Sequence, residues 1–559
     1  MRMAILLSPS EQTLHTGLSL PPGTLAVMTS YQRQAGHHVD QYDLDTDLLR
    51  AWDGGRLARA DLEFLYDKAR VLGYLAGGQD PEIDHFCEVL LGDKPIAGLD
   101  IVGVSLGGSF SWMPIHSGFV LARFVQDRLG VPVAIGGNNI YYLTLFQEIY
   151  RELWDVLTST FRFIVVGPGH RTLDEIARHA REEHWPPAST RVDGLVGRGP
   201  DGRISYAAKA RAEVLRPDFH GLDLRWYQHW VEDETTAADP DLARAVNAEQ
   251  LFKWPPSLTQ YAQKVHRRNP PRGRIPKIVI PYTFNYHCPY ACAFCAESDR
   301  SDPLVIGAAE QVVEDLEYLS NEYDTPYFYF YNNYFNLSKS FVKKFSAEVR
   351  RRGLRIFWQD CARFNNMDAE LLGLMRDSGC QTLWFGMETG GERLMNVVNK
   401  RLTVDRVEQG LELCREFGVW ANLEMIVGFP HESMDDFGRT VRFLHKHRDL
   451  VNFFQANRYF VVPSSTMGRQ PDAFGMEIVR DLYTYDSLLE LNLTWFRSGR
   501  DLSHLPNNFD SYAFDEVGGR DHAAIRKEGR KRLNLLHDMQ RAEFYETRQM
   551  LKMIDSIAK

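Results

Sequence analysis

Cys288-Pro-Tyr-Ala-Cys292-Ala-Phe-Cys295 is the most informative stretch of this chain, because it gathers three of the seven cysteines into one short segment. Thiolates are soft ligands that suit zinc or iron–sulfur clusters. A four-iron cluster normally has four cysteine ligands, so three from one loop would leave one iron open to another molecule. A zinc knuckle would need a fourth Cys or His, and His287 is an immediate neighbour that rarely shares one tetrahedral ion. The spacing favours an iron–sulfur cluster on Cys288, Cys292 and Cys295.

The cysteine segment follows the first strand of a predicted α/β domain. Apolar strands alternate with helical patterns after it, which is typical of a parallel, barrel-like sheet, here a partial (β/α)6 barrel with six units instead of eight. The strands are expected at about 277–283, 326–331, 355–360, 382–387, 422–428 and 453–462. The predicted barrel domain spans residues 276–470, and residues 471–559 are expected to form a mostly helical carboxy-terminal domain.

Residues 1–190 contain an earlier alternation of strands and helices. Continuous apolar strands separated by helices predict a doubly wound, Rossmann-like parallel sheet. Such sheets bind ligands beyond the carboxyl ends of their strands, and those ends carry Ser105, Gly136, Gly137 and Gly167. Residues 191–275 contain turn signals such as Asn269-Pro-Pro-Arg-Gly and are expected to be a linker and lead-in segment.

The composition limits the class of protein. The net charge is -10 and the chain is 44% hydrophobic, so it has no basic footprint for nucleic acid but enough apolar residues for a sizeable core. No apolar run approaches the roughly 18 residues of a membrane span, and the start does not resemble a signal peptide. An odd number of cysteines with three crowded together implies a reducing compartment, and we expect a cytoplasmic protein.

The C-x3-C-x2-C spacing at a strand end, with the aromatic Phe294 before the third cysteine, resembles the radical S-adenosylmethionine (SAM) superfamily. The resemblance extends over residues 277–468. It implies a [4Fe-4S] cluster on the three cysteines and chelation of the open iron by the amino and carboxylate groups of SAM. An electron from the cluster would then cleave SAM to a 5′-deoxyadenosyl radical.

Later strand ends carry further parts of this resemblance. Asn332-Asn333-Tyr334-Phe335 occupies the place of D-D-x-F, with both carboxylates replaced by amides. Gly386-Met-Glu388-Thr is similar to G-x-E-S, Gly428-Phe-Pro-His-Glu432 to G-x-P-x-E, and Val461-Val-Pro463-Ser-Ser-Thr466 to P-x-P-G-T. An arginine at a strand end can pair with a carboxylate. The implied SAM-binding residues are Phe294, Asn332, Asn333, Arg363, Glu388, Gly428 and Val462.

The amino-terminal domain resembles the cobalamin-binding domain of one branch of the superfamily. The matching segments include Gly103-Val-Ser105, Ile135-Gly-Gly137 and Gly167-Pro-Gly169. The resemblance implies cobalamin contacts at Ser105, Gly136, Gly137 and Gly167. The Asp-x-His-x-x-Gly motif that supplies a histidine to cobalt in many cobalamin proteins is absent, so no histidine is expected below the cobalt. His170 is expected to be a surface or helix-start residue.

The branch implies a cobalamin-dependent radical SAM methyltransferase. It would act on an unactivated carbon or phosphorus of a small molecule, in a biosynthetic pathway, with an external electron donor of flavodoxin or ferredoxin type. A cobalamin-dependent radical SAM cyclase or ring-rearranging enzyme without net methylation is an alternative. A non-enzymatic cobalamin-binding sensor is another, although the intact cysteine triad argues against it. No catalytic side chain is singled out.

Overall fold

The computed structural model describes the chain except residues 17, 108–110, 183–184, 187–190, 200, 254–255, 300–301, 481, 499–511 and 544–559. It divides into two compact units. Unit 1 comprises Met1–Gly17, Pro22–Asp223 and Arg480–Ser511, and unit 2 comprises Leu18–Pro21, Leu224–Val479 and Tyr512–Lys559. Residues 471–559, expected as one domain, are therefore shared between the units, and so is the lead-in segment 191–275.

Unit 1 is built on a five-stranded parallel sheet in the order β2-β1-β3-β4-β5. The strands are β1 (Arg2–Leu7), β2 (His38–Asp43), β3 (Ile101–Ser105), β4 (Val133–Gly136) and β5 (Phe163–Ile164). The order reverses between β1 and β3, which is the arrangement of a doubly wound sheet and places its ligand crevice at the carboxyl ends of the strands. The predicted fold class of this unit is confirmed.

Helices cover both faces of this sheet. Leu25 of α2 (Gly23–Gln34) and Leu173 of α9 (His170–His179) share one apolar cluster with Met3 and Ile101 of the strands. The unit also contains α1 (Glu11–Thr16), α3 (Leu44–Asp53), α4 (Lys68–Leu75), α5 (Pro81–Leu91), α6 (Trp112–Arg128), α7 (Asn138–Leu145), α8 (Arg151–Thr160), α19 (Tyr485–Ser498) and the hairpin β6 (Val196–Arg198) with β7 (Ile204–Tyr206).

Unit 2 is built on a six-stranded parallel sheet whose strands follow in chain order. They are β10 (Ile280–Tyr282), β13 (Tyr327–Phe330), β14 (Phe357–Ala362), β15 (Cys380–Glu388), β16 (Trp420–Val427) and β17 (Phe453–Arg458). Each β-to-β connection contains a helix, so consecutive strands become parallel neighbours. The predicted six-unit barrel-like sheet is confirmed.

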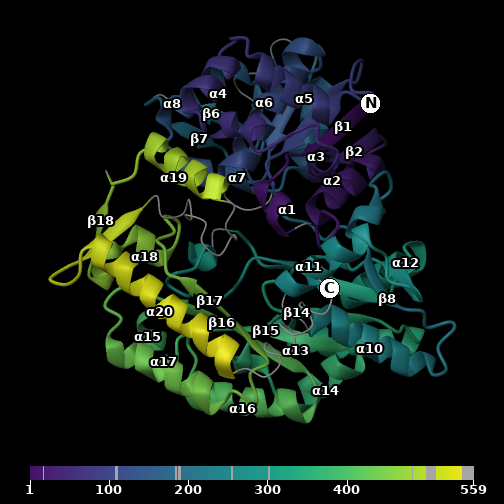
Figure 1. Cartoon of the computed structure of the whole chain (residues 1–559), viewed down its shortest axis with the longest axis vertical. Helices are drawn as coiled ribbons and strands as arrows, with labels where there is room; N and C mark the ends of the chain where they lie inside the picture. Colours follow the sequence, from purple (N-terminus) through teal and green to yellow (C-terminus); the bar gives the residue numbers. More distant parts are fainter. Residues whose placement is uncertain are drawn as a thin grey trace. The chain divides into compact units, whose positions relative to one another are not determined.

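The connecting helices lie around the outside of this sheet (Figure 1). They are α12 (Ala309–Glu322), α13 (Lys339–Arg352), α14 (Ala369–Asp377), α15 (Glu392–Val397), α16 (Val404–Glu416) and α17 (Met434–Lys446). Burial alternates along β16: Leu423 and Met425 are buried, whereas Glu424 and Ile426 are partly exposed. Alternate residues of a strand point to opposite faces, so Glu424 and Ile426 lie on the inner face of the curved sheet.

The rest of unit 2 surrounds this framework. Phe252 at the end of α10 (Pro240–Phe252) packs against Tyr327 of β13. Near the carboxyl terminus, α20 (His522–Glu543) packs along β17, and Figure 1 shows it in yellow beside the strands. The smaller elements are β8 (His229–Glu232), α11 (Pro256–Arg268), β9 (Arg274–Lys277), β11 (Asn285–Tyr286), β12 (Val305–Ile306), α18 (Thr466–Arg469), β18 (Met476–Val479) and β19 (Ala513–Glu516).

Within the residues that the structure describes, no helix is both long and apolar enough to cross a membrane.

Candidate cluster and cofactor site

Residues 288–295, which contain the three cysteines and are here called the cysteine loop, follow β11. His287 has a positive φ of 67° and turns the chain into the loop. Cys292 is buried, and Cys288 and Cys295 are partly exposed. The backbone N–H of Tyr290 bonds the sulfur of Cys288, and that of Glu297 bonds the sulfur of Cys295. Amide donors aimed at sulfur stabilise thiolates and are one of the features that tune iron–sulfur clusters.

Loops from two other strand ends hold the cysteine loop in place. Ala293 donates its N–H to the Val398 carbonyl (2.8 Å) and accepts one from Met467 (2.9 Å). The backbone N–H of Thr466 bonds the Ser298 hydroxyl at 2.9 Å. The segments after β15 and β17 are thus bonded directly to the cluster-binding segment, although about 100 or more residues of chain separate them.

The cysteine loop offers three thiols from one short segment, one buried and two partly exposed. Across the described ranges, no group of three or more His, Cys, Asp or Glu side chains is placed to hold one metal ion. A structural zinc site takes four ligands on one ion, whereas each cysteine of a cubane binds a separate iron. Three thiolates from one loop suit a [4Fe-4S] cluster with one open iron.

Arg363, at the end of β14, reaches the cysteine loop. One terminal nitrogen of its buried guanidinium lies 3.9 Å from the sulfur of Cys292, and the other donates to the carbonyl of Lys400. Its central carbon lies 3.8 Å from the ring centre of Tyr290. The Nε atom of Arg363 is buried and, among the described residues, has no hydrogen-bond partner. This arginine is thus well placed to supply positive charge beside the three cysteines.

Glu388 at the end of β15 forms a buried ion pair with Lys400, at 2.7 Å between Oε1 and Nζ. Glu388 has a positive φ of 71°, a conformation that is uncommon for a side chain this large and is often found at functional sites. Burial alone would lower the pKa of Lys400, but the Glu388 carboxylate, together with Tyr334 and Cys292, outweighs this and the pKa is raised. Lys400 belongs to no motif, so the sequence offers no signal for it.

The side chain of Asn332 is hydrogen-bonded within the protein. Its Oδ1 accepts the N–H groups of Phe284 (3.0 Å) and Asn285 (2.9 Å), and its Nδ2 donates to Asp360 at 2.6 Å. The side chain therefore ties the start of β11 to β14 and leaves a single N–H for a ligand. Asn333 beside it is bonded through its backbone N–H to Asn285, and its side chain stays partly exposed. Of the two amides, Asn333 is the better candidate for a cofactor contact.

Phe294 lies in one apolar cluster with Phe429, the residue after Gly428. The ring of Phe294 meets that of Phe429 edge-to-face, with ring centres 5.7 Å apart. Gly428 has φ +81°, which side chains rarely adopt. Val462 is buried, and its carbonyl accepts the N–H and hydroxyl of Ser465 at the start of α18. Glycine at position 428 thus meets a backbone requirement.

Glu424 on the inner face of β16 is a second residue without a sequence signal. It is paired in register with Gly386 of β15, over which the Glu388–Lys400 pair lies. Burial raises the pKa of Glu424 to about 8, and the neighbouring Glu388 carboxylate adds to this while Lys400 opposes it. An acid of this kind changes protonation near neutral pH and is a candidate for contact with a bound molecule.

The residues predicted for cobalamin share the carboxyl edge of the unit 1 sheet. Ser105 pairs in register with Gly136, and Gly167 follows the neighbouring strand. Gly137 has φ +106°, and a Cβ there would lie 2.8 Å from the Leu106 backbone. The requirement for glycine at position 137 is therefore set by packing within the protein. His170 is the first residue of α9 and is buried, so it starts a helix but does not lie on the surface.

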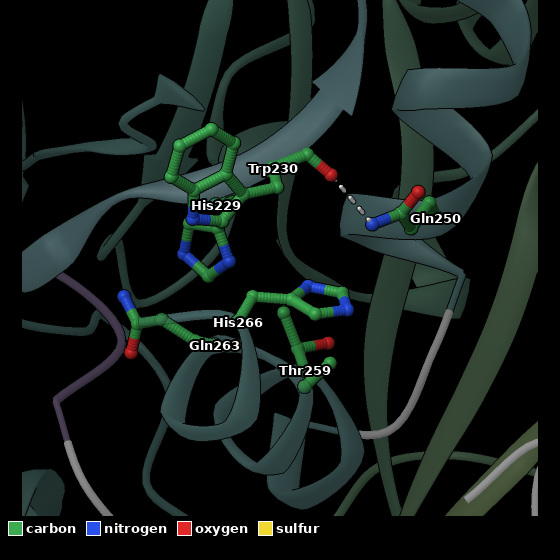
Figure 2. Close-up of a pocket in the computed structure, with 7 residues that line it drawn as sticks. His229, Trp230, Gln250, Thr259, Gln263 and His266 are labelled. Carbon is green, nitrogen blue, oxygen red and sulfur yellow. Dashed lines mark hydrogen bonds between the residues drawn. The ribbon is translucent and has the colours of Figure 1, made fainter. Parts of the chain in front are cut away.

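A small cavity lies elsewhere in unit 2. Figure 2 shows that His229, Gln263 and His266 face it from β8 and α11, and Gln250 bonds the carbonyl of Trp230 at 3.2 Å. Burial lowers the pKa of His229 to about 4. The cavity has room for about one water molecule and lies among none of the predicted site residues. It is too small for a cofactor.

Comparison with known proteins agrees with this geometry. Residues 282–444 match the family model of the Radical SAM superfamily. The chain is 29% identical over 160 residues to a Pyrococcus horikoshii protein named an uncharacterized methyltransferase, PH0819, covering 28% of this chain and 35% of that one. It is 24% identical over 168 residues to the anaerobic magnesium-protoporphyrin IX monomethyl ester cyclase of Rubrivivax gelatinosus, covering 30% of each. The matched segments span only about a third of these relatives.

Among solved structures, the fold is similar to that of the radical SAM methyltransferase TsrM from Kitasatospora setae, solved with cobalamin and a [4Fe-4S] cluster. The TM-score is 0.53 at 16% identity, covering 87% of this chain and 80% of TsrM. The similarity extends well beyond residues 282–444, so both units share the fold of that enzyme.

Proposed function

We propose that this chain, which contains a radical SAM domain, is a cobalamin-dependent radical SAM methyltransferase. Its substrate would be an unactivated carbon or phosphorus of a small molecule in a biosynthetic pathway. The observation that carries the proposal is the cysteine loop, which offers three thiols from one segment beside Arg363 and the buried Glu388–Lys400 pair. This arrangement combines cluster ligands with charged groups of both signs beside them.

Different residues of unit 2 would bind the cluster and SAM. Cys288, Cys292 and Cys295 would hold a [4Fe-4S] cluster. The SAM carboxylate suits Arg363, whose Nε has no partner in the part of the chain that the structure describes, and the hydroxyl or amino groups of SAM suit Glu388 and Asn333. Phe294, Gly428 and Val462 offer apolar surface and backbone next to them. The bound cluster and SAM supply a carbon-centred radical, while the protein positions the reactants and excludes water.

In unit 1, cobalamin would lie at the carboxyl edge of the sheet, near Ser105, Gly136, Gly137 and Gly167. The reversal of strand order between β1 and β3 supports this placement. Cobalamin would supply the methyl group, and an electron donor of flavodoxin or ferredoxin type would reduce the cluster. The named methyltransferase relative and the fold of TsrM favour methyl transfer, whereas the cyclase relative supports a second candidate, ring closure without net methylation.

The test is anaerobic purification and reconstitution, followed by counts of iron, sulfide and cobalt. Four iron and four sulfide with one cobalt per chain are expected for a full set of cofactors. The reduced protein is then given SAM labelled in its methyl group, and 5′-deoxyadenosine is measured. Label in a product supports methyl transfer, and deoxyadenosine without labelled product favours the cyclase. A chain that binds cobalamin but keeps its cellular effect after replacement of all three cysteines by alanine would be a sensor.

A further inference from the structure

The segment that contains the proposed SAM contact Gly428 closes into a turn through a single carboxylate. Gly428 donates its N–H to Oε2 of Glu432 at 2.6 Å. Gly428 and His431 both have positive φ, at 81° and 56°. We call residues 428–432 the adenine-side turn, because in the family that this segment resembles the G-x-P-x-E motif follows the strand that supports the adenine of SAM. Phe429 within the turn packs against Phe294 of the cysteine loop. Its shape depends on where the Glu432 carboxylate is held.

Glu432 is held by a residue 100 positions away in sequence. Nη1 of Arg532 on α20 lies 2.5 Å from the same Oε2 atom, and the Glu432 carbonyl accepts both terminal nitrogens of Arg532 at 3.3 Å. The side chains are 1% and 4% exposed, so the charge of each is compensated inside the protein. Removal of one partner of such a pair leaves a buried charge uncompensated. The turn therefore depends on α20.

The backbone of α20 also lies close to the adenine-side turn. A Cβ placed on Gly428 would lie 3.8 Å from the Cα of Gly529, one turn before Arg532. The neighbouring β19 adds a second bond, because Oε1 of Glu516 accepts the N–H of His431 at 2.6 Å. Arg520 in turn pairs with Glu516 and with Glu528. The contacts run from β19 and α20 to both ends of the adenine-side turn.

We infer that the carboxy-terminal segment 512–543 positions the adenine-side turn for SAM, and that Arg532 is the positioning residue through its bond to Glu432. The inference rests on the proposed function, because it concerns the same SAM site. Arg532 itself touches neither the cysteines nor the residues proposed to contact the SAM carboxylate. Its loss should weaken SAM binding and leave the cluster intact.

The experiment compares full-length, reconstituted R532M with wild type. Methionine keeps much of the volume of the side chain and removes its charge and donors. We expect the KM for SAM in deoxyadenosine formation to rise about tenfold or more, with a much smaller change in kcat. R532K, which retains the charge, should recover part of the affinity. Iron content and the EPR spectrum of the reduced cluster without SAM should match wild type.

R541M is the matched control, because Arg541 lies on the same helix and is largely exposed. E432Q keeps the size of the side chain but removes its charge, and gives the same comparison should R532M not fold. A SAM KM in R532M or E432Q within about twofold of R541M would overturn the inference. A wild-type cluster whose EPR spectrum does not respond to SAM would instead overturn the proposed function, so the two failures are distinct.

Discussion

Lys400 Nζ and Glu388 Oε1 lie 2.7 Å apart and are both buried beside the cysteine loop. The two residues are only 12 positions apart in sequence, but Glu388 ends a strand and Lys400 follows the helix α15. Their pairing places a compensated charge at the centre of the candidate SAM site, and it makes each residue dependent on the other.

Replacement of Lys400 by methionine should therefore destabilise the protein. The Glu388 carboxylate would remain buried without its counter-charge, at a cost of about 3 kcal/mol in the free energy of unfolding. Urea denaturation of the cofactor-free protein measures this. The double variant E388Q/K400M, which removes both charges, should recover most of the loss. Equal stabilities for K400M and the double variant would show that the loss in K400M does not come from an uncompensated Glu388 charge.

The pKa of Glu424 should make stability fall as the pH rises. Its pKa is raised from 4.5 to about 8 in the folded chain, so the folded state binds more protons than the unfolded state between these values. Stability should decrease across pH 4.5–8, by up to about 1.4 kcal/mol per pH unit from this residue. E424Q should flatten the decrease. Parallel stability–pH curves for wild type and E424Q would contradict the assignment.

Asn332 should act as a structural link between strands. N332A removes an acceptor for two backbone N–H groups and a donor to the buried Asp360. An unfolding free energy lower by about 2–4 kcal/mol is expected, because several buried groups lose their partners. N333A serves as the comparison, since the Asn333 side chain is partly exposed, and it should cost much less. The prediction fails if the two variants are equally stable.

Gly137 should not tolerate a side chain. In G137A the new Cβ would meet the Leu106 backbone at 2.8 Å, at a φ of +106°. We expect a loss of about 2 kcal/mol or more of stability, together with lower cobalamin content after reconstitution. G197A is the control, because Gly197 is exposed and a Cβ there would meet nothing within 4 Å. Normal stability in G137A would show that the loop after β4 can shift.

Local pattern was enough to predict most strands of both sheets. The six stretches expected within residues 276–470 became the six strands of the unit 2 sheet, because strands buried on both faces are mostly apolar. The periodicity of residues 142–153 predicts one helix there, but α7 ends at Leu145 and α8 begins at Arg151. No Gly or Pro marks this break. Phe146 and Tyr150 are both buried there, so tertiary packing ended the helix.

The sequence by itself determined the cysteine loop and the strand ends that surround it, because ligand spacing and apolar periodicity are local properties of the chain. Only the tertiary structure decided that Lys400 compensates Glu388, that Asp360 binds Asn332, and that Arg532 reaches Glu432. It also decided that α19 belongs to unit 1 while α20, which follows it in the chain, belongs to unit 2. Charge pairing depends on which segments lie in contact in the folded protein, and a local sequence pattern does not specify these contacts.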